Sequence, residues 1–399
     1  MEKLEIICFS TQPWYGSYWT NKQQIMSRLA KMGHRILYIN PYDYASWGHL
    51  FRSLKRKISR KQLVVPLDQP QENLWLYSPI DLLPGPRKGI FLWLNQKLRE
   101  LMLRLQLKRY DFKKPLLWIY QPETVDFVDH LAHGLVVYDC VDEYSAFPYY
   151  GSNPKRKEMI LKKEDELLKK ADIVFTTSKT LYEKKGQKNK NTFLVANVGD
   201  FEHFNVTQRS DYPIAPEMQD IPHPILGFVG ALDSYKVDFE IIKNIATAHP
   251  EWSIVLIGKT EAKGEKTDIS EIKKLGNVHF LGGKPYEITP QYIKAFDVCL
   301  IPYNINEYTK SCFPLKFHEF LATGKPLVVT ALPDLIDFGG VSYLSYTKQE
   351  FLQNCEKAVK ENKPELSQKR QQVASQNTWE DRINRLLEII ESFEKQTRS

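Results

Sequence analysis

The stretch CFPLKFHEFLATGKPLVVT, residues Cys312 to Thr330, contains the patterns of a loop, a short helix and a strand in immediate succession. Its apolar residues recur at helical spacing, at Leu315, Phe317, Phe320 and Leu321. Gly324 is typical of the position that follows a helix, and the run from Pro326 to Thr330 predicts a buried strand. The segment predicts one unit of an α/β fold. The charged residues at the start of its helix are either an ordinary solvated face or part of a binding site.

The same alternation of strand and helix patterns recurs along the chain. Short apolar runs bounded by turn residues occur in the first half as KLEIICFS, HRILYINP, KPLLWIYQP, GLVVYDCVD, ADIVFTTS and NTFLVANV. They return in the second half as PILGFVGA, WSIVLIGK, NVHFLGG, FDVCLIPY and KPLVVT. Helical patterns lie between most of them, which predicts an α/β fold of two doubly wound parallel sheets with helices on both faces.

These patterns predict two domains. We expect a first Rossmann-like domain over residues 1–205 and a second over residues 206–378. The irregular, proline-rich residues 211–224 predict the linker between them. An amphipathic pattern over residues 379–399 predicts a final helix, capped by Thr378, that packs back on the first domain. Because open α/β sheets bind ligands at the carboxyl ends of their strands, the central cleft between the two sheets is the expected site.

Length and composition exclude several classes of protein. With 399 residues, 42% hydrophobic and 26% charged, the chain is long enough for two globular cores. Its five cysteines are scattered and form no CxxC pair, so we expect neither a disulfide framework nor a metal site. The motifs GxGxxG and GxxxxGKS/T are absent, which argues against a dehydrogenase or P-loop kinase. No apolar run is long enough for a signal peptide or a membrane span, so we expect a cytoplasmic protein.

Positive charge is concentrated in the first half. Residues 1–205 hold 32 lysines and arginines against 22 acidic residues, whereas residues 206–399 hold 23 against 26. The basic residues gather in segments 51–63 and 89–110, and the second is an amphipathic helix pattern with Trp93 near its start. It predicts either contact with an anionic membrane surface, at the inner face of the cell membrane, or a core-facing helix with a solvated basic side. Nucleic acid is not expected, because the basic residues lie among aliphatic residues and no recognised motif is present.

Several stretches together resemble the GT-B glycosyltransferases, specifically the group 1 family of nucleotide-sugar transferases. They are FVGALDSYKVDFEII, HFLGGKPYEITPQYIKAFDVCLIPY, the segment quoted first and NTWEDRINRLLEII. In the first half, VYDCVDEYSAF and KKADIVFTTSKTLYE are similar to transferases of teichuronic-acid and related surface-polysaccharide synthesis. The resemblance implies a retaining, metal-independent enzyme. It would move a sugar from a nucleotide sugar, a UDP-sugar by expectation, to a glycan or lipid-linked acceptor, with no cofactor because the nucleotide sugar is a substrate.

In this family the diphosphate lies against the start of the helix that follows Pro314, where unpaired backbone N–H groups and the helix dipole favour anions. The resemblance therefore implies that this loop and first turn bind the donor, through Cys312, Phe313, Pro314 and Leu315. Lys316 would stand near the phosphates, and Glu319 would accept hydrogen bonds from the ribose hydroxyls. These roles are expectations from the resemblance, since a helix lysine and a helix carboxylate are otherwise commonly solvated.

Other second-domain residues follow from the same resemblance. Gly230 would let the backbone approach the ligand, and Lys236 would supply the phosphate-binding cation, because Ala231 stands where many relatives have arginine. Residues around Gly282, with Tyr286 beside them, would contact the nucleobase.

The family's Glu-x7-Glu motif is only half present. Its first position is Ser311, which we expect near the donor, and the nearby Glu307 is the carboxylate expected to reach the donor sugar instead.

On the first-domain side, YDCVDEY ends a strand with two acids. Asp142 is expected to contact the donor sugar or the acceptor hydroxyl, with Asp139 as the weaker candidate, although Val141 replaces the histidine of many relatives. Gly16, in the aromatic loop after the first strand, is expected to line the acceptor side. The departures at Ala231, Val141 and Ser311 leave two alternatives open: a catalytically inactive nucleotide-sugar-binding scaffold, and a nucleotide-sugar epimerase of the same fold.

Overall fold

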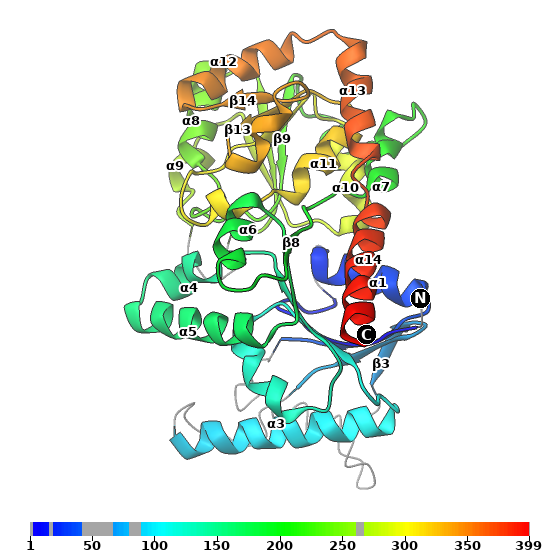
Figure 1. Ribbon diagram of the computed structural model, residues 1–399. Coiled ribbons are helices and arrows are strands. Elements are labelled where there is room, and N and C mark those ends of the chain that lie inside the picture. Colours follow the sequence, from blue (N-terminus) through cyan, green and yellow to red (C-terminus); the bar gives the residue numbers. More distant parts are fainter. Residues whose placement is uncertain (1–2, 16–18, 42–66, 80–88, 261–266, 399) are drawn as a thin grey trace, which may run out of the picture.

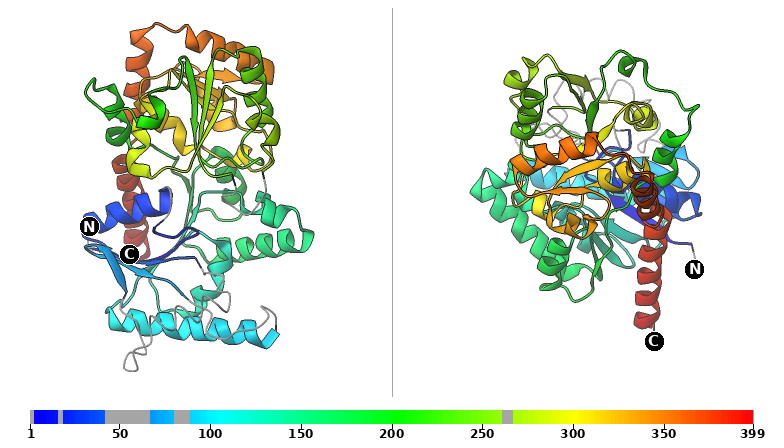
Figure 2. Two further views of the ribbon diagram at one scale, coloured as in Figure 1. Left: turned by 180° about the vertical axis from the view of Figure 1, so that it is seen from behind. Right: turned by 90° about the horizontal axis from the view of Figure 1, so that it is seen from above.

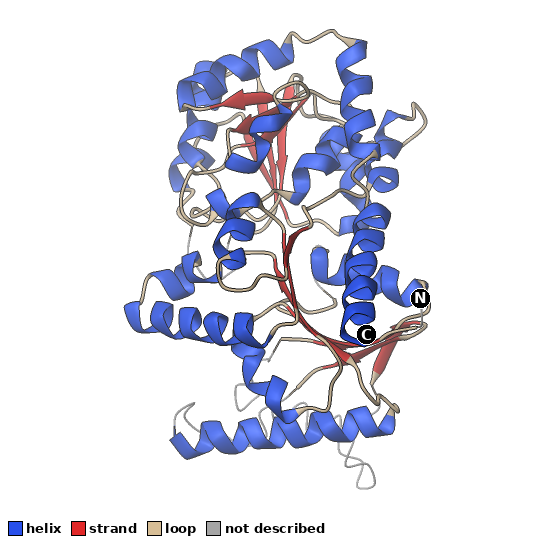
Figure 3. Cartoon of the chain, viewed as in Figure 1, coloured by secondary structure: helices blue, strands red, loops and turns tan. Residues whose placement is uncertain are grey.

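The chain folds into two α/β units stacked end to end, each built around its own sheet (Figure 1). The computed structural model describes residues 3–15, 19–41, 67–79, 89–260 and 267–398. The predicted residue Gly16 and the basic segment 51–63 lie outside the described residues. Figure 3 shows the two sheets as separate layers, each with helices packed against its faces.

The first sheet has the order β3-β4-β2-β1-β5-β6-β7-β8. Its strands are β1 (Glu5–Phe9), β2 (Arg35–Ile39), β3 (Asp68–Gln71), β4 (Leu74–Tyr77), β5 (Leu116–Ile119), β6 (Val136–Cys140), β7 (Ile173–Thr176) and β8 (Thr192–Leu194). All pairings are parallel except that of β3 with β4, which forms an antiparallel edge. The sequence patterns predicted the other six strands and their parallel arrangement, and they missed β3 and β4. Asn73, with φ of 61°, makes the tight turn between those two strands.

Helices cover both faces of this sheet, as the alternation predicted. They are α1 (Asn21–Lys31), α3 (Gly89–Arg109), α4 (Pro148–Gly151), α5 (Pro154–Lys170) and α6 (Lys179–Gly186). One face packs against α1, and the other packs against α3 and α5 through Leu103, Leu107 and Leu167. The buried strands have apolar residues on both sides, which explains why they read as continuous apolar runs.

The second sheet is parallel throughout, in the order β11-β10-β9-β12-β13-β14. Its strands are β9 (Ile225–Val229), β10 (Ser253–Ile257), β11 (Val278–Gly282), β12 (Val298–Ile301), β13 (Leu327–Thr330) and β14 (Tyr343–Ser345). Its helices are α7 (Phe201–Asn205), α8 (Phe239–Ala248), α9 (Ser270–Lys273), α10 (Thr289–Ile293), α11 (Leu315–Ala322), α12 (Lys348–Val359) and α13 (Pro364–Ser375). The five strands predicted from the sequence are present. The short edge strand β14 was missed.

The opening segment folds as its pattern predicts. α11 begins after Pro314, and Phe317, Phe320 and Leu321 are fully buried in the second core. Gly324 follows the helix with φ of 68°, a left-handed conformation that few residues other than glycine adopt. Lys325 and Pro326 then lead into β13.

The chain crosses between the two units twice, and the two crossings lie side by side. The first follows β8, and the second lies between α13 and the final helix α14 (Trp379–Arg398), which returns to the first unit and runs beside α1 (Figure 2). The backbone N–H of Gly199 donates to Asn377 O at 3.2 Å, which joins the two crossings. Thr378 caps α14 by accepting a hydrogen bond from the N–H of Asp381 at 3.3 Å. Trp379, together with apolar residues further along α14, packs into the first core.

One prediction about the connection is wrong. Residues 211–224 are no interdomain linker: Ala215 and Met218 are buried in the second core, around the short 3₁₀ turn Pro216–Met218. The chain has already crossed near Gly199, and Phe204 packs in the second core as well. Proline makes this backbone irregular without making it exposed, which is why composition alone placed the linker too late.

The outermost helix of the first unit is α3, at the end farthest from the second unit (Figure 1). Its inward face carries Asn95, Glu100, Leu103, Gln106 and Leu107, whereas the apolar residues of its first turns are exposed. Of the two readings of this helix, the core-facing one holds for its later turns, whereas Phe91 and Leu101 of its apolar pattern are exposed. The helix carries apolar residues around its circumference, so spacing alone did not define the buried face. Within the described part of the chain, no helix is long and apolar enough to cross a membrane.

Candidate functional site

A cleft lies between the carboxyl ends of the two sheets and is lined from both units. The second unit contributes the loop after β9, the loop after β10, the residues after β11 and the start of α11. The first unit contributes the start of α1, the loop after β6 and Asn197 in the first crossing. This placement follows from topology, because the carboxyl ends of parallel strands meet at one edge of each sheet.

The start of α11 forms one wall of the cleft, with Cys312, Phe313, Pro314, Leu315, Lys316 and Glu319 among the lining residues. Pro314 occupies the N-cap position, where its missing N–H costs no helical hydrogen bond. The Lys316 ammonium lies 2.5 Å from a carboxylate oxygen of Glu319, one turn along the same helix. Burial raises the pKa of Glu319, and the nearby lysine opposes that shift. Both side chains face the cleft, so a ligand at this wall meets a cation and a carboxylate held as a pair.

The second unit contributes another lysine to the cleft. Lys236, in the loop after β9, lines the cleft, and its ammonium lies 5.0 Å from the centroid of the Tyr303 ring. Gly230 and Ala231 line the same loop. A β-carbon built on Gly258 would lie 1.7 Å from the carbonyl oxygen of Gly230, so the ends of β9 and β10 approach as closely as glycine allows.

The far end of the cleft is formed by the residues after β11. Tyr286 lines it and stacks on His203, with ring centroids 4.4 Å apart and an angle of 15° between the rings. The predicted residue Gly282 does not line the cleft. Its carbonyl accepts from the N–H of Gly258 at 2.9 Å, in an irregular pairing of β10 with β11, and Gly283 takes the lining position.

Asp142 is the first-unit carboxylate of the cleft. It follows β6, and one of its oxygens accepts a hydrogen bond from the hydroxyl of Tyr308 in the second unit at 2.9 Å. Around this bond, Phe147 of the first unit packs against Tyr235 and Tyr308 of the second, with centroid distances of 6.2 and 4.9 Å. The two units are thus joined beside Asp142 by an aromatic cluster and a hydrogen bond.

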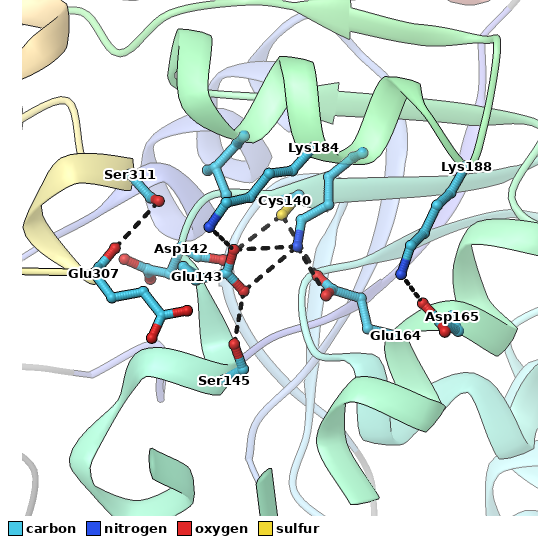
Figure 4. A network of polar contacts seen from close by, with 12 residues as sticks. Cys140, Asp142, Glu143, Ser145, Glu164, Asp165, Lys184, Lys188, Glu307 and Ser311 are labelled. Atoms are coloured by element: carbon cyan, nitrogen blue, oxygen red, sulfur yellow. Dashed lines mark hydrogen bonds and ion pairs between the residues drawn. The ribbon is translucent and has the colours of Figure 1, made fainter. Parts of the chain in front are cut away.

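The loop that carries Asp142 rests on a buried charge network (Figure 4). Lys185 of α6 lies 2.8 Å from Glu164 and 3.5 Å from Glu143, and all three side chains are buried. Tyr138 donates to Glu164 at 2.7 Å. Because each charge has an opposite partner, the network fixes the geometry of the loop and is not itself open to a ligand.

Besides Gly282, three predicted site residues do not line the cleft. Asp139 is fully buried within β6 and accepts a hydrogen bond from Trp118 Nε1 at 3.2 Å. Its side chain points to a face of the sheet and not to the cleft at the end of the strand. Glu307 is half-exposed and pairs with Lys157 of α5 at 3.3 Å. Ser311 is buried in a 3₁₀ turn, where its hydroxyl donates to the Glu307 carbonyl at 3.3 Å. The position equivalent to the family's first glutamate therefore serves the fold.

Among the lining residues that the sequence did not predict, Asn197 and Lys22 stand out. Asn197 donates to the Phe313 carbonyl at 2.7 Å, and its side-chain oxygen accepts from Arg382 at 2.8 Å and from Asn21 at 3.0 Å. It therefore ties the loop before α11 to α1 and α14. Lys22, in the first turn of α1, is buried and lines the first-unit side. The only signal for Lys22 was a lysine near the start of the helix after the first strand, and Asn197 gave no signal.

No metal-binding cluster is present in the described ranges, since no three His, Cys, Asp or Glu side chains gather as metal ligands would. The groups that line the cleft are lysines, backbone N–H groups and the two carboxylates of Asp142 and Glu319. Such a set suits a ligand with a polyanionic end and a hydroxyl-rich end.

Residues 223–361 match the family described as "Glycosyl transferases group 1". This part of the chain is a group 1 glycosyl transferase domain. It contains Gly230, Lys236, Tyr286, Lys316 and Glu319, so the second-unit wall of the cleft lies within the glycosyl transferase domain. The first-unit residues lie outside the match.

A Bacillus subtilis protein, TuaH, whose name assigns it to teichuronic acid biosynthesis as a glycosyltransferase, is 28% identical to this chain over 257 residues. The alignment covers 61% of this chain and 64% of TuaH.

Solved structures show the same fold over nearly the full length. Anabaena HepE, in complex with UDP and glucose, superposes with a TM-score of 0.65 at 14% identity, covering 98% of this chain and 100% of HepE. Sucrose-phosphate synthase from Thermosynechococcus elongatus superposes with a TM-score of 0.69 at 14% identity, covering 99% of this chain and 100% of the synthase. The chain has the two-sheet GT-B fold of these glycosyltransferases, as the sequence predicted.

Proposed function

We propose that this chain transfers a sugar from a UDP-sugar to a glycan or lipid-linked acceptor, with retention of anomeric configuration and without a metal, in bacterial surface-polysaccharide synthesis. The observation that carries the proposal is the wall formed by Lys236, Lys316 and the start of α11, inside the glycosyl transferase domain. The similarity to TuaH supports the polysaccharide role, and the UDP held by HepE supports the donor base.

The donor diphosphate would lie against this wall. As the bond between sugar and diphosphate breaks, negative charge develops on the departing phosphate. Two lysines and the N–H groups of a helix start would stabilise that charge without rearrangement. Glu319 would accept hydrogen bonds from the ribose hydroxyls, and Lys316, already 2.5 Å from that carboxylate, would hold it in position.

Retention would follow from attack on the same face that the diphosphate leaves. Among the described residues, Asp142 and Glu319 are the carboxylates that line the cleft, and we assign Glu319 to the ribose. That assignment leaves no pair of carboxylates for a double displacement of the kind retaining hydrolases use. The acceptor hydroxyl would then approach beside Asp142, and its proton would pass to the departing phosphate. Closure of the two units would keep water away from the reacting carbon.

The test is a panel of UDP-, GDP- and ADP-sugars with thermal-shift and hydrolysis readouts. We expect UDP-sugars to raise the melting temperature and to be turned over slowly in the presence of EDTA. Lys236→Met should lower the chemical rate about 100-fold, the effect of losing one transition-state contact, whereas the exposed Lys190→Met should leave it unchanged. Stabilisation without turnover by any acceptor would favour the inactive scaffold, and loss of activity in EDTA would overturn metal independence.

We further propose that α3 contacts an anionic membrane surface where lipid-linked acceptors reside. Ile90, Phe91, Leu92 and Trp93 are 40–60% exposed at one end of α3, and exposed basic residues lie along the helix. The double substitution Phe91→Ser with Trp93→Ser should abolish sedimentation with anionic liposomes. Tyr346→Ser, which alters a 60% exposed aromatic residue of the second unit, should leave it intact. Equal sedimentation of both variants would refute the membrane contact.

A further inference from the structure

Lys22 is a buried lysine that faces the cleft, an unusual position for a lysine that serves only the fold. It lies at the second position of α1, is 4% exposed and lines the first-unit side of the cleft. Among the residues that the structure describes, its ammonium has no hydrogen-bond or ion-pair partner, and its nearest aromatic contact is the Tyr120 ring, 5.2 Å away. A lysine side chain buried to this extent is normally paired, because an ammonium that loses water without gaining a partner is destabilising.

The helix itself does not favour a cation at this place. The first turn of α1 contains no acidic residue, and the N–H groups at a helix start already present positive charge. Thr20 and Gln23 form a capping box, so the helix start is stabilised without help from Lys22. Burial lowers the pKa of Lys22, as expected for an ammonium that has lost water without gaining a close partner.

Among the described residues, no neighbouring carboxylate forms an ion pair with it. Asp142 and Asp139 attract the ammonium from beyond ion-pair distance, and Arg382 repels it. Asp142 is already bound to Tyr308, and one oxygen of Asp139 is bound to Trp118. Lys22 is buried, has no ion-pair partner among the described residues, lies at a helix start and faces the cleft. The first three features are each unfavourable for stability, and such a combination is typical of a ligand-binding position.

We propose that Lys22 and the first turn of α1 bind an anionic group carried by a sugar in the cleft. This inference rests on the proposed function. The donor diphosphate is assigned to the opposite wall, at α11 and Lys236, so the anion that reaches Lys22 belongs to the sugar side of the reaction. Two sources share this chemistry: the carboxylate of a uronic-acid donor, and a phosphate on the acceptor.

The experiment compares the full-length chain with Lys22→Met and with Lys31→Met, which alters the exposed lysine at the end of the same helix. Dissociation constants are measured by calorimetry for UDP, UDP-glucose and UDP-glucuronate, and for glucose 6-phosphate in the presence of UDP. Melting temperatures are measured without ligand.

We expect UDP to bind the three proteins equally. One anionic probe should bind the wild type about 10-fold tighter than Lys22→Met, the effect of one charged hydrogen bond, and Lys31→Met should keep that affinity. A gain limited to UDP-glucuronate over UDP-glucose identifies the donor carboxylate, and a gain limited to glucose 6-phosphate identifies the acceptor phosphate. The melting temperature of Lys22→Met should equal or exceed that of the wild type, because an unpaired buried charge has been removed.

Three results would overturn the proposal. The first is that no anionic probe distinguishes Lys22→Met from the wild type. The second is weaker binding of UDP itself, which would place Lys22 at the diphosphate. The third is a lower melting temperature or failure to fold, which would give Lys22 a structural role. Failure of UDP to bind any of the three proteins contradicts the proposed function instead, so the two failures are distinct.

Discussion

The hydroxyl of Tyr308, in the second unit, donates a hydrogen bond to the carboxylate of Asp142, in the first, at 2.9 Å. The bond crosses the cleft at the point where the proposed acceptor would approach. It joins the two units, and the rings of Phe147, Tyr235 and Tyr308 pack around it in tilted and edge-on contacts. The contact therefore joins the two units beside the cleft and occupies the first-unit carboxylate.

Tyr308→Phe keeps the ring and removes this bond. We expect closure to weaken by about 1 kcal/mol, the net worth of one hydrogen bond, and the radius of gyration in small-angle scattering to increase. A saturating UDP-sugar should restore the compact form. Tyr149→Phe, at a 52% exposed tyrosine of the same region, should scatter like the wild type. Identical scattering by wild type and Tyr308→Phe would show that the bond does not control closure.

Glu319→Ala removes the carboxylate assigned to the ribose. The loss of hydrogen bonds to a charged group should weaken UDP binding by about 1.5–3 kcal/mol, measured by calorimetry. Because Lys316 then loses its partner at 2.5 Å, the variant should also become less stable. The exposed Glu365→Ala, near the start of α13, provides the control. Undiminished affinity for UDP would remove Glu319 from the donor site.

Gly199 packs against the backbone of α11. A β-carbon built on Gly199 would lie 2.9 Å from Glu319 N and 2.9 Å from His318 Cβ, closer than real contacts allow. Gly199→Ala should therefore displace α11, lower the free energy of unfolding by about 1–3 kcal/mol and weaken UDP binding. Gly276→Ala introduces the same methyl group with no atom within 4 Å and should change neither quantity. Wild-type affinity in Gly199→Ala would show that α11 tolerates the shift.

His318 predicts a pH dependence of stability. It is stacked on Phe313 and buried, which lowers its pKa to about 3. The unfolded chain takes up a proton on this histidine below about pH 6.5, and the folded chain does not until far lower pH. Its contribution to stability is therefore complete above pH 6.5 and is lost as the pH falls towards 3.

His318→Phe tests this sign. Between about pH 7 and pH 5, the wild type should lose about 2 kcal/mol more unfolding free energy than the variant, measured by chemical denaturation. His130→Phe, at the half-buried end of the 3₁₀ segment Pro122–His130, is the control. An equal pH dependence in wild type and His318→Phe would contradict the interpretation.

The sequence predicted the layers of the fold because buried parallel strands read as continuous apolar runs. It missed β3 and β14, short edge strands that carry little apolar signal, and also β4, whose apolar run is only four residues long. The resemblance to the group 1 family placed the start of α11 at the ligand, and Pro314 and Gly324 marked the two ends of that helix.

The side-chain roles were harder to predict because they depend on orientation and on distant partners. Asp139 and Asp142 are three residues apart, yet one is buried in a strand and the other lines the cleft. Glu307 is exposed and pairs with Lys157, which is far away in the sequence. Lys22 and Asn197 acquire their positions only when the first unit, α14 and α11 meet.

The central claim is that the start of α11, with Lys236 and Lys316, receives the diphosphate of a nucleotide sugar in the cleft. A crystal structure of the chain soaked with UDP tests it most directly. We predict density for the two phosphates within hydrogen-bonding distance of the backbone N–H groups of Leu315 and Lys316 and of the Lys236 ammonium. A nucleotide bound elsewhere, or phosphates turned away from α11, would contradict the account.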